Sequence, residues 1–193
     1  GYETVSTEVF AKMADTQTPQ GILTVLEQPV YDLTQLLEQP DPLFLMLENL
    51  QDPGNLGTMI RTGEGAGITG VIMNNQTVDI FNPKTIRATM GSIFRVPFVY
   101  VPDLALVLEQ MHAKGIYTYA AHLKGQEYYD SFSFREPTAF LIGNEGNGLS
   151  KEISDQAGQY LKIPMEGRVE SLNASIAAAL LMYEAHRQRS ARL

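Results

Sequence analysis

Short apolar runs alternate with stretches of helical periodicity along the chain from residue 43 onward. Nearly continuous apolar runs of this length are typical of strands that are covered on both faces. The predicted strands are 43–47, 70–73, 98–101, 116–121, 139–142 and 160–163. The predicted helices are 55–66, 83–94, 103–114, 150–157 and 172–190. Strands that alternate with helices favour an α/β fold, in which a parallel sheet is flanked by helices.

The first part of the chain, residues 1–42, lacks a clear core pattern. Its short mixed segments are separated by Pro19, Pro29, Pro40 and Pro42, which is typical of a linker, and we expect one strand and short helices there. We therefore divide the chain into a linker, 1–42, and one compact domain, 43–193. Because the sequence begins at Gly1 without an initiator Met, we expect it to be part of a longer protein.

Several predicted helices begin at residues that favour a helix N-terminus. Asn55, Asp103 and Ser150 are expected N-caps, and Pro83 suits a first turn. The helix 172–190 differs, because its apolar residues occupy more than one face. A sheet would cover only one of these faces. The other either packs on a second copy of the chain or is buried within one large core.

The composition restricts the possible functions. The chain has no cysteine and three scattered histidines, so we expect no metal site. No apolar run approaches the roughly 20 residues that a membrane-spanning helix needs, so we expect a cytoplasmic protein without a membrane partner. The net charge of -8 argues against avid, nonspecific binding of nucleic acid. A separate RNA-recruiting module could supply the basic surface that this chain lacks.

Two glycine-rich segments have different positions relative to the predicted strands. Gly65, Gly67 and Gly70 form a G-x-G-x-x-G pattern, but it follows a helix and precedes a strand, so we interpret it as a helix C-cap and turn. The segment 143–150 instead follows strand 139–142 and leads into a helix, where ligands of α/β sheets usually bind. Glu145 lies among its glycines, which favours a functional loop over a simple tight turn.

Two further polar segments follow strands and lead into helices. In segment 163–175, Ser171 and Asn173 lie near the start of the last helix, where each is a candidate cap as well as a candidate site residue. In segment 48–62, Asn55 is followed by Arg61, which points either toward the loop or into solvent.

Together these segments resemble the three motifs of the SpoU/TrmH branch of the SPOUT methyltransferases. The matches are Asn-Leu-Gly-x-x-x-Arg in 55–61, Gly-x-Glu-Gly-x-Gly in 143–148, and Ile-Pro-Met with Ser-Leu-Asn-x-Ser in 163–175. The resemblance covers about 43–188, and it extends to Pro19-Gln-Gly-Ile22, which is similar to the junction after the small RNA-binding domain of ribosomal-RNA members. Residues 1–42 would then include the remnant of that junction.

The resemblance implies a C-terminal trefoil knot, a homodimer and S-adenosylmethionine as cofactor. Topology rules alone would argue against a knot. The positions that match the family's cofactor site are Gly143, Ile163, Met165, Leu172 and Asn173. The implied reaction is methylation of a ribose 2′-hydroxyl in structured RNA, with 23S ribosomal RNA of the large subunit favoured over transfer RNA. A catalytically silent RNA-binding or assembly protein and a nucleotide-dependent α/β enzyme remain as alternatives.

The resemblance also implies a set of functional polar residues: Asn55, Arg61, Glu145, Ser171 and Asn173. Arginine is a poor proton acceptor, since its pKa lies above ~12. We therefore expect Arg61 to orient an RNA phosphate and to stabilise the forming alkoxide, unless burial beside a sulfonium makes it the base. Further candidate phosphate contacts are Lys84, Arg87, Arg95 and Arg168.

Overall fold

A computed structural model describes residues 1–14, 16–122, 125–168 and 171–190. Within this part of the chain, seven strands form one sheet in the order β3-β2-β1-β6-β4-β7-β5, and each neighbouring pair is parallel. The strands are β1 (Leu43–Leu47), β2 (Gly70–Asn74), β3 (Phe98–Val101), β4 (Tyr117–Ala121), β5 (Glu127–Tyr128), β6 (Thr138–Ile142) and β7 (Gln159–Lys162). The predicted parallel sheet is confirmed, and β5 is the strand that the apolar pattern missed.

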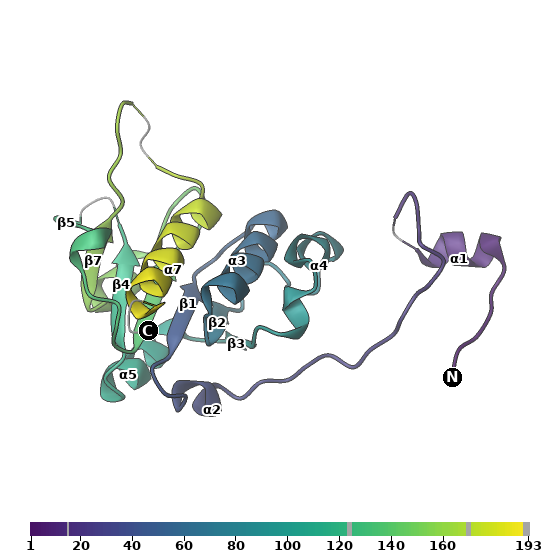
Figure 1. The fold of residues 1–193 in the computed structure, drawn as a ribbon, viewed down its shortest axis with the longest axis horizontal. Coiled ribbons are helices and arrows are strands. Elements are labelled where there is room, and N and C mark those ends of the chain that lie inside the picture. The colour runs from purple at the N-terminus through teal and green to yellow at the C-terminus, as the bar shows by residue number, and fades with distance from the viewer. Residues whose placement is uncertain (15, 123–124, 169–170, 191–193) are drawn as a thin grey trace.

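The helices are α1 (Thr7–Met13), α2 (Leu33–Leu37), α3 (Pro53–Ala66), α4 (Pro83–Thr89), α5 (Leu104–Ala113), α6 (Lys151–Gln156) and α7 (Ala174–Ser190). Two short 3₁₀ helices are η1 (Ser92–Phe94) and η2 (Tyr129–Ser131). Successive side chains of a strand point to opposite faces. In β1, Leu45 packs in a cluster with Met59 and Met182, whereas Phe44 packs in a cluster with Leu108. Helices α3 and α7 therefore cover one face of the sheet, and α5 covers the other (Figure 1).

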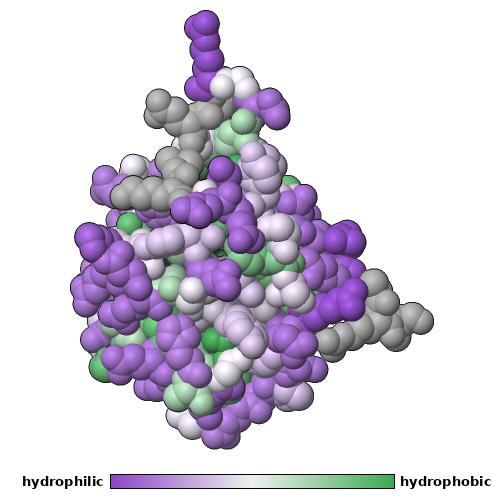
Figure 2. All heavy atoms as spheres, turned by 90° about the vertical axis from the view of Figure 1, so that its left-hand side faces the viewer, coloured by the Kyte–Doolittle hydropathy of each residue, from purple (hydrophilic) through white to green (hydrophobic). Residues whose placement is uncertain are grey.

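The edge of the sheet at β5 is polar. Both residues of β5 are exposed, and the Lys162 ammonium lies 4.9 Å from the centre of the Tyr128 ring. The face of the molecule on this side is mostly hydrophilic, with apolar residues in small groups (Figure 2). Such an edge resists pairing with a strand of another molecule.

Two predicted helix boundaries were wrong. The N-cap of α3 is Asp52, whose carboxylate accepts a hydrogen bond from Asn55 N at 2.7 Å, because Pro53 starts the helix two residues before the predicted cap. The predicted helix 83–94 ends at Thr89, since Met90 and Gly91 adopt positive φ angles of 50° and 88°. Asp103 and Ser150 are N-caps as predicted. Gly67 ends α3 with a φ of 77°, which confirms the C-cap interpretation.

The N-terminal segment differs from its prediction in one respect. Residues 1–14 and 16–42 hold α1 and α2 but no strand, because the apolar side chains Ile22, Val25 and Leu26 stay exposed and find no neighbouring strand. No residue of α1 is buried, and this part of the chain leads away from the sheet (Figure 1). The division at residue 42 stays a prediction. None of the helices in the described ranges is long and apolar enough to cross a membrane.

The last helix, α7, buries one face and exposes the other. Ala178, Leu181 and Met182 are fully buried, whereas Ile176 and Tyr183 are about half exposed. The alternative that one large core buries both apolar faces of this helix is therefore wrong for the single chain. The trefoil knot stays a prediction, because residues 123–124 and 169–170, in the loops before β5 and α7, lie outside the described ranges.

Candidate active site

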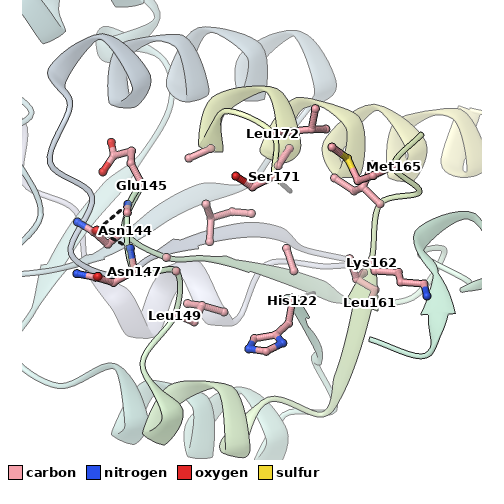
Figure 3. A pocket seen from close by; sticks show the side chains of 18 residues that line it. His122, Asn144, Glu145, Asn147, Leu149, Leu161, Lys162, Met165, Ser171 and Leu172 are labelled. Atoms are coloured by element: carbon pink, nitrogen blue, oxygen red, sulfur yellow. Dashed lines mark hydrogen bonds between the residues drawn. The ribbon is translucent and has the colours of Figure 1, made fainter. Parts of the chain in front are cut away.

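A cavity of about 380 Å³ opens at the carboxyl ends of β4, β6 and β7. This is the edge where parallel sheets commonly bind ligands. Its walls come from the loop after β6, the segment after β7 and the start of α7 (Figure 3). In that view, Met165, Ser171 and Leu172 lie on the α7 side of the cavity, and His122 and Leu149 lie on the opposite side. Gly143, Glu145, Ile163, Met165, Ser171 and Leu172, all predicted site residues, line the cavity.

The loop after β6, which we call the 143–150 loop, has a compact backbone. Asn144 and Gly148 exchange two backbone hydrogen bonds of 3.0 and 2.8 Å, and Gly148 has a positive φ of 69°. The Asn144 side-chain oxygen also accepts hydrogen bonds from the N–H groups of Gly146 and Asn147 at 2.9 and 3.0 Å (Figure 3). A Cβ atom on Gly143 would lie 2.0 Å from the carbonyl carbon of Gly148, so only glycine fits there.

Glu145 joins the 143–150 loop to the start of α3. One carboxylate oxygen accepts hydrogen bonds from Asp52 N at 2.9 Å and from the Asn55 side-chain amide at 3.0 Å, and the other accepts from Gln51 N at 3.1 Å. Two of these donors, Gln51 N and Asp52 N, are backbone N–H groups at the N-terminus of α3, where negative charge is favoured. The loop and the helix start are therefore held together by one carboxylate.

Asn173 joins the start of α7 to the same place. Its side-chain amide donates to the Asn55 side-chain oxygen at 3.0 Å. Its own oxygen accepts from the N–H groups of Ser175 and Ile176 at 2.9 and 3.3 Å. Asn173 thus caps α7, which confirms one of its two predicted roles, while its role as a site residue stays a prediction.

The environment of Glu145 lowers the pKa of its carboxyl group. Partial burial raises this pKa, but the hydrogen bonds from Asn55, Asp52 and Gln51 together outweigh it, and the pKa lies below its ordinary value of 4.5. Glu145 is therefore ionised at neutral pH and acts only as a hydrogen-bond acceptor. A positioning role fits this state, and a general-acid role does not.

Arg61 is the predicted site residue that lies apart from the others. It is exposed on α3 and does not line the cavity of its own chain. Six residues of helix place it about 9 Å along the axis and about 120° around it from Asn55. The structure therefore brings Asn55, Glu145 and Asn173 into contact beside the cavity, whereas Arg61 is exposed and does not line it.

The candidate phosphate contacts have different surroundings. The guanidinium of Arg95 donates to the Glu64 carboxylate in two hydrogen bonds, one of 2.9 Å, and this pairing contributes to lowering the Glu64 pKa to about 2. The Lys84 ammonium lies 3.8 Å from the Asp52 carboxylate. Arg168 is exposed in the segment that follows β7. Arg95 is thus engaged within the protein, and Arg168 lies in a segment that contributes to the cavity wall.

Two residues of the site were missed from the sequence. Glu48 is buried, and its carboxylate accepts a hydrogen bond from Ser150 N at 2.7 Å, so it holds the far end of the 143–150 loop. Asn144 organises the loop as described above. A carboxylate directly after a buried strand and an asparagine beside two glycines are the local signals that could have indicated them.

Comparison with known proteins identifies related sequences and structures. Residues 42–183 match the sequence model of the SpoU rRNA Methylase family. The chain is 35% identical over 179 residues to the 23S rRNA (guanosine(2553)-2′-O)-methyltransferase RlmP of Bacillus subtilis, with 93% of this chain and 70% of that protein aligned. It is 33% identical over 199 residues to the 23S rRNA (uridine(2479)-2′-O)-methyltransferase of Streptomyces viridochromogenes, with 96% and 69% aligned.

A solved structure has the same fold. The AdoMet-bound rRNA methyltransferase from Sinorhizobium meliloti superposes with a TM-score of 0.87 at 34% sequence identity. The superposition covers 94% of this chain and 70% of that chain. The agreement therefore extends over nearly the whole chain.

Proposed function

The chain belongs to the SpoU rRNA methylase family, and from that premise we propose that it transfers a methyl group from S-adenosylmethionine to a ribose 2′-hydroxyl of ribosomal RNA. Methylation of RNA with this cofactor is the activity of the family and of this chain. One observation supports the proposal independently of the family match. Three separate segments are joined beside the cavity by hydrogen bonds among Glu145, Asn55 and Asn173.

The cavity suits S-adenosylmethionine in size and lining. Its volume of about 380 Å³ lies within the range of small-ligand sites. Leu149, Ile163 and Leu172 provide apolar surface for a flat base, and the glycines at 143 and 148 let backbone groups approach closely. Of the predicted cofactor residues, Gly143, Ile163, Met165 and Leu172 line the cavity and would hold the cofactor, and Asn173 lies next to Leu172 in the chain but does not line the cavity. When bound, S-adenosylmethionine supplies an electrophilic methyl group.

The remaining chemistry falls to residues of the chain, which must orient a ribose hydroxyl and stabilise negative charge on its oxygen. Ser171 lines the cavity, and Asn173 is fixed by Asn55 next to it. We assign Ser171 and Asn173 to orienting the ribose, and Asn55 and Glu145 to holding these segments in place. Removal of the hydroxyl proton is assigned to an RNA phosphate or water, because the Glu145 carboxylate already accepts three hydrogen bonds and its pKa lies below its ordinary value, which makes it a weak base.

Arg61 is assigned to the RNA. Arg61 is exposed on α3, so its guanidinium is accessible to a backbone phosphate. Direct stabilisation of the reacting oxygen by Arg61 requires the cavity of a second copy, since it does not line the cavity of its own chain. The arginine is thus linked to the proposed homodimer.

The homodimer is supported by the exposed face of α7. Ile176, Leu180 and Tyr183 form an apolar strip there, and together with Tyr129 they line a shallow groove. Exposed apolar strips of this kind mark interaction surfaces. A symmetric pair of chains that packs α7 on its copy would cover the strip.

Ribosomal RNA is proposed as the substrate because the two relatives described above are named as 23S rRNA methyltransferases. A cytoplasmic location follows from that substrate. The test is to incubate the chain with methyl-labelled S-adenosylmethionine and either 23S ribosomal RNA or transfer RNA, and to map ribose methylation. We expect label at a ribose of ribosomal RNA. Label only in transfer RNA would identify the alternative substrate, and cofactor binding without label would favour a catalytically silent RNA-binding protein.

A further inference from the structure

Three asparagines lie at the carboxyl ends of three adjacent strands. Asn74 is the last residue of β2, Asn49 lies two residues after β1, and Asn144 lies two residues after β6. In the sheet, β1 lies between β2 and β6. Of the three, only Asn144 lines the cavity. Their side chains are nevertheless connected across all three strands.

Asn74 fixes the conformation of Asn49. The Asn74 side-chain oxygen accepts a hydrogen bond from Asn49 N at 3.0 Å, and its amide donates to the Asn49 side-chain oxygen at 2.8 Å. The Thr77 hydroxyl donates to the same Asn74 oxygen at 2.9 Å. Asn49 has a positive φ of 56°, a left-handed conformation that few residues other than glycine adopt, although asparagine does so more readily than most. The reciprocal pair with the buried Asn74 imposes it here.

Asn49 in turn determines where Asn144 lies. The Asn49 carbonyl oxygen accepts a hydrogen bond from the Asn144 side-chain amide at 2.9 Å. The direction of that carbonyl depends on the backbone angles of Asn49, which Asn74 holds. The other end of the Asn144 side chain accepts from Gly146 N and Asn147 N in the 143–150 loop. The contacts thus run without a break from β2 to the wall of the cavity.

We propose that Asn74 is a positioning residue for the cofactor site, which acts on the 143–150 loop through Asn49 and Asn144. This inference rests on the proposed function, in which the cavity binds S-adenosylmethionine. The register of the sheet does not need the side-chain amide, because Asn74 is paired with Val101 of β3 through its backbone and the pairing of β1 with β2 ends at Met73. Asparagine is also depleted in strands, and a buried polar side chain is costly unless every hydrogen bond is made. Both points indicate that Asn74 serves the loop.

The test compares Asn74→Ala with a control of similar structural cost. Tyr100→Phe is that control: its hydroxyl accepts from Ile80 N at 2.9 Å and donates to Val78 O at 2.7 Å, on the neighbouring strand β3 and outside the cavity. Both variants lose buried hydrogen bonds and are expected to lower the Tm. S-adenosylhomocysteine is then titrated into each protein without RNA by calorimetry. We expect Asn74→Ala to raise the Kd about tenfold, and Tyr100→Phe to leave it within about twofold.

Two further variants keep the test decisive. Thr77→Val removes the hydroxyl that donates to Asn74 with little change in shape, and it should raise the Kd by about threefold if Asn74→Ala proves too unstable to titrate. Combining Asn74→Ala with Asn144→Ala should raise the Kd by less than the product of the single effects, since both act through one chain of contacts. In activity assays, the KM for S-adenosylmethionine should rise while kcat stays near that of the unmodified chain.

The outcomes separate this inference from the proposed function. If the unmodified chain binds S-adenosylhomocysteine and the Asn74 and Thr77 variants bind equally well, the positioning role is overturned and the proposed function stands. Equal losses of affinity in Asn74→Ala and Tyr100→Phe would also overturn it, because they would reflect stability alone. Failure of the unmodified chain to bind S-adenosylhomocysteine would overturn the cofactor assignment and the positioning role together.

Discussion

The side-chain amide of Asn173 donates a hydrogen bond of 3.0 Å to the side-chain oxygen of Asn55, and the two residues are 118 positions apart in sequence. Asn55 in turn donates to Glu145 at 3.0 Å. Asn55 therefore uses both ends of its amide, one toward each of the other two segments of the site. A single buried side chain holds the start of α3, the 143–150 loop and the start of α7 in one arrangement.

Asn55→Ala should disrupt the contacts among the three segments of the site. The effect does not come from helix capping, because Asp52 is the N-cap of α3. It removes the donor to Glu145 and the acceptor for Asn173, and we expect a loss of about 1–3 kcal/mol in the free energy of unfolding together with weaker binding of S-adenosylhomocysteine. Urea unfolding and calorimetric titration measure the two effects. Asn75→Ala, at an exposed position after β2, is the control and should change neither. Normal cofactor affinity in Asn55→Ala would contradict the organising role.

Gly143→Ala should abolish cofactor binding. The added Cβ would lie 2.0 Å from the carbonyl carbon of Gly148 and 2.1 Å from Leu149 N, so the backbone of the 143–150 loop would have to move. Gly146→Ala is the matched control in the same loop, because its Cβ would meet only the Asn144 side chain, at 3.5 Å. We expect the control to bind S-adenosylhomocysteine within a few-fold of the unmodified chain. Similar affinities for the two variants would mean that the loop adjusts easily and is not rigid.

Glu145→Gln should flatten the acid dependence of stability. The folded-state pKa of Glu145 lies below 4.5, so its carboxylate stabilises the fold at pH values above the unfolded-state pKa, and this contribution is lost as the pH falls through the folded-state pKa. Urea unfolding between neutral pH and about pH 3 should show a shallower decline for Glu145→Gln than for the unmodified chain. Glu109→Gln, on exposed α5 surface, should keep the original decline. An unchanged profile in Glu145→Gln would show that its hydrogen bonds contribute little.

Leu180→Asp should disrupt the proposed homodimer. Leu180 lies in the apolar strip of α7, and a buried charge without a partner is strongly unfavourable at an interface. Sedimentation at micromolar protein should show a monomer for this variant and a dimer for the unmodified chain. Leu106→Asp, on exposed α5 surface at the other face of the sheet, should leave the dimer intact. A dimer that survives Leu180→Asp would place the interface elsewhere.

Arg61→Ala and Arg61→Lys should lower turnover without changing cofactor affinity. The residue stands outside the cavity of its own chain and is assigned to RNA phosphate and developing negative charge. Loss of one such donor typically reduces kcat by about a hundredfold or more. Turnover is measured at saturating RNA and cofactor, with Lys114→Ala, at the C-cap of α5, as the control. Unchanged turnover in both Arg61 variants would remove the arginine from the mechanism.

The apolar pattern by itself determined the class of fold and most of its elements. Each of the six predicted strands is present, because a short buried run such as 43–47 carries its own signal in the side chains. β5 was missed because its two residues, Glu127 and Tyr128, are exposed and give no such signal. The N-cap of α3 was misplaced, since Asp52 and Asn55 are both good caps and only the position of Pro53 in the folded helix selects between them.

The sequence also indicated which segments form the candidate site, since the glycines of 143–148 and the polar residues of 171–173 are visible as patterns. Only the tertiary structure decided how they meet. The order of strands places β6 beside β1, and this brings Glu145 to Gln51 and Asp52 and connects Asn74 to Asn144 through Asn49. Local propensity depends on neighbours in sequence, whereas a hydrogen bond between residues some 90 or more positions apart depends on how the whole sheet is assembled.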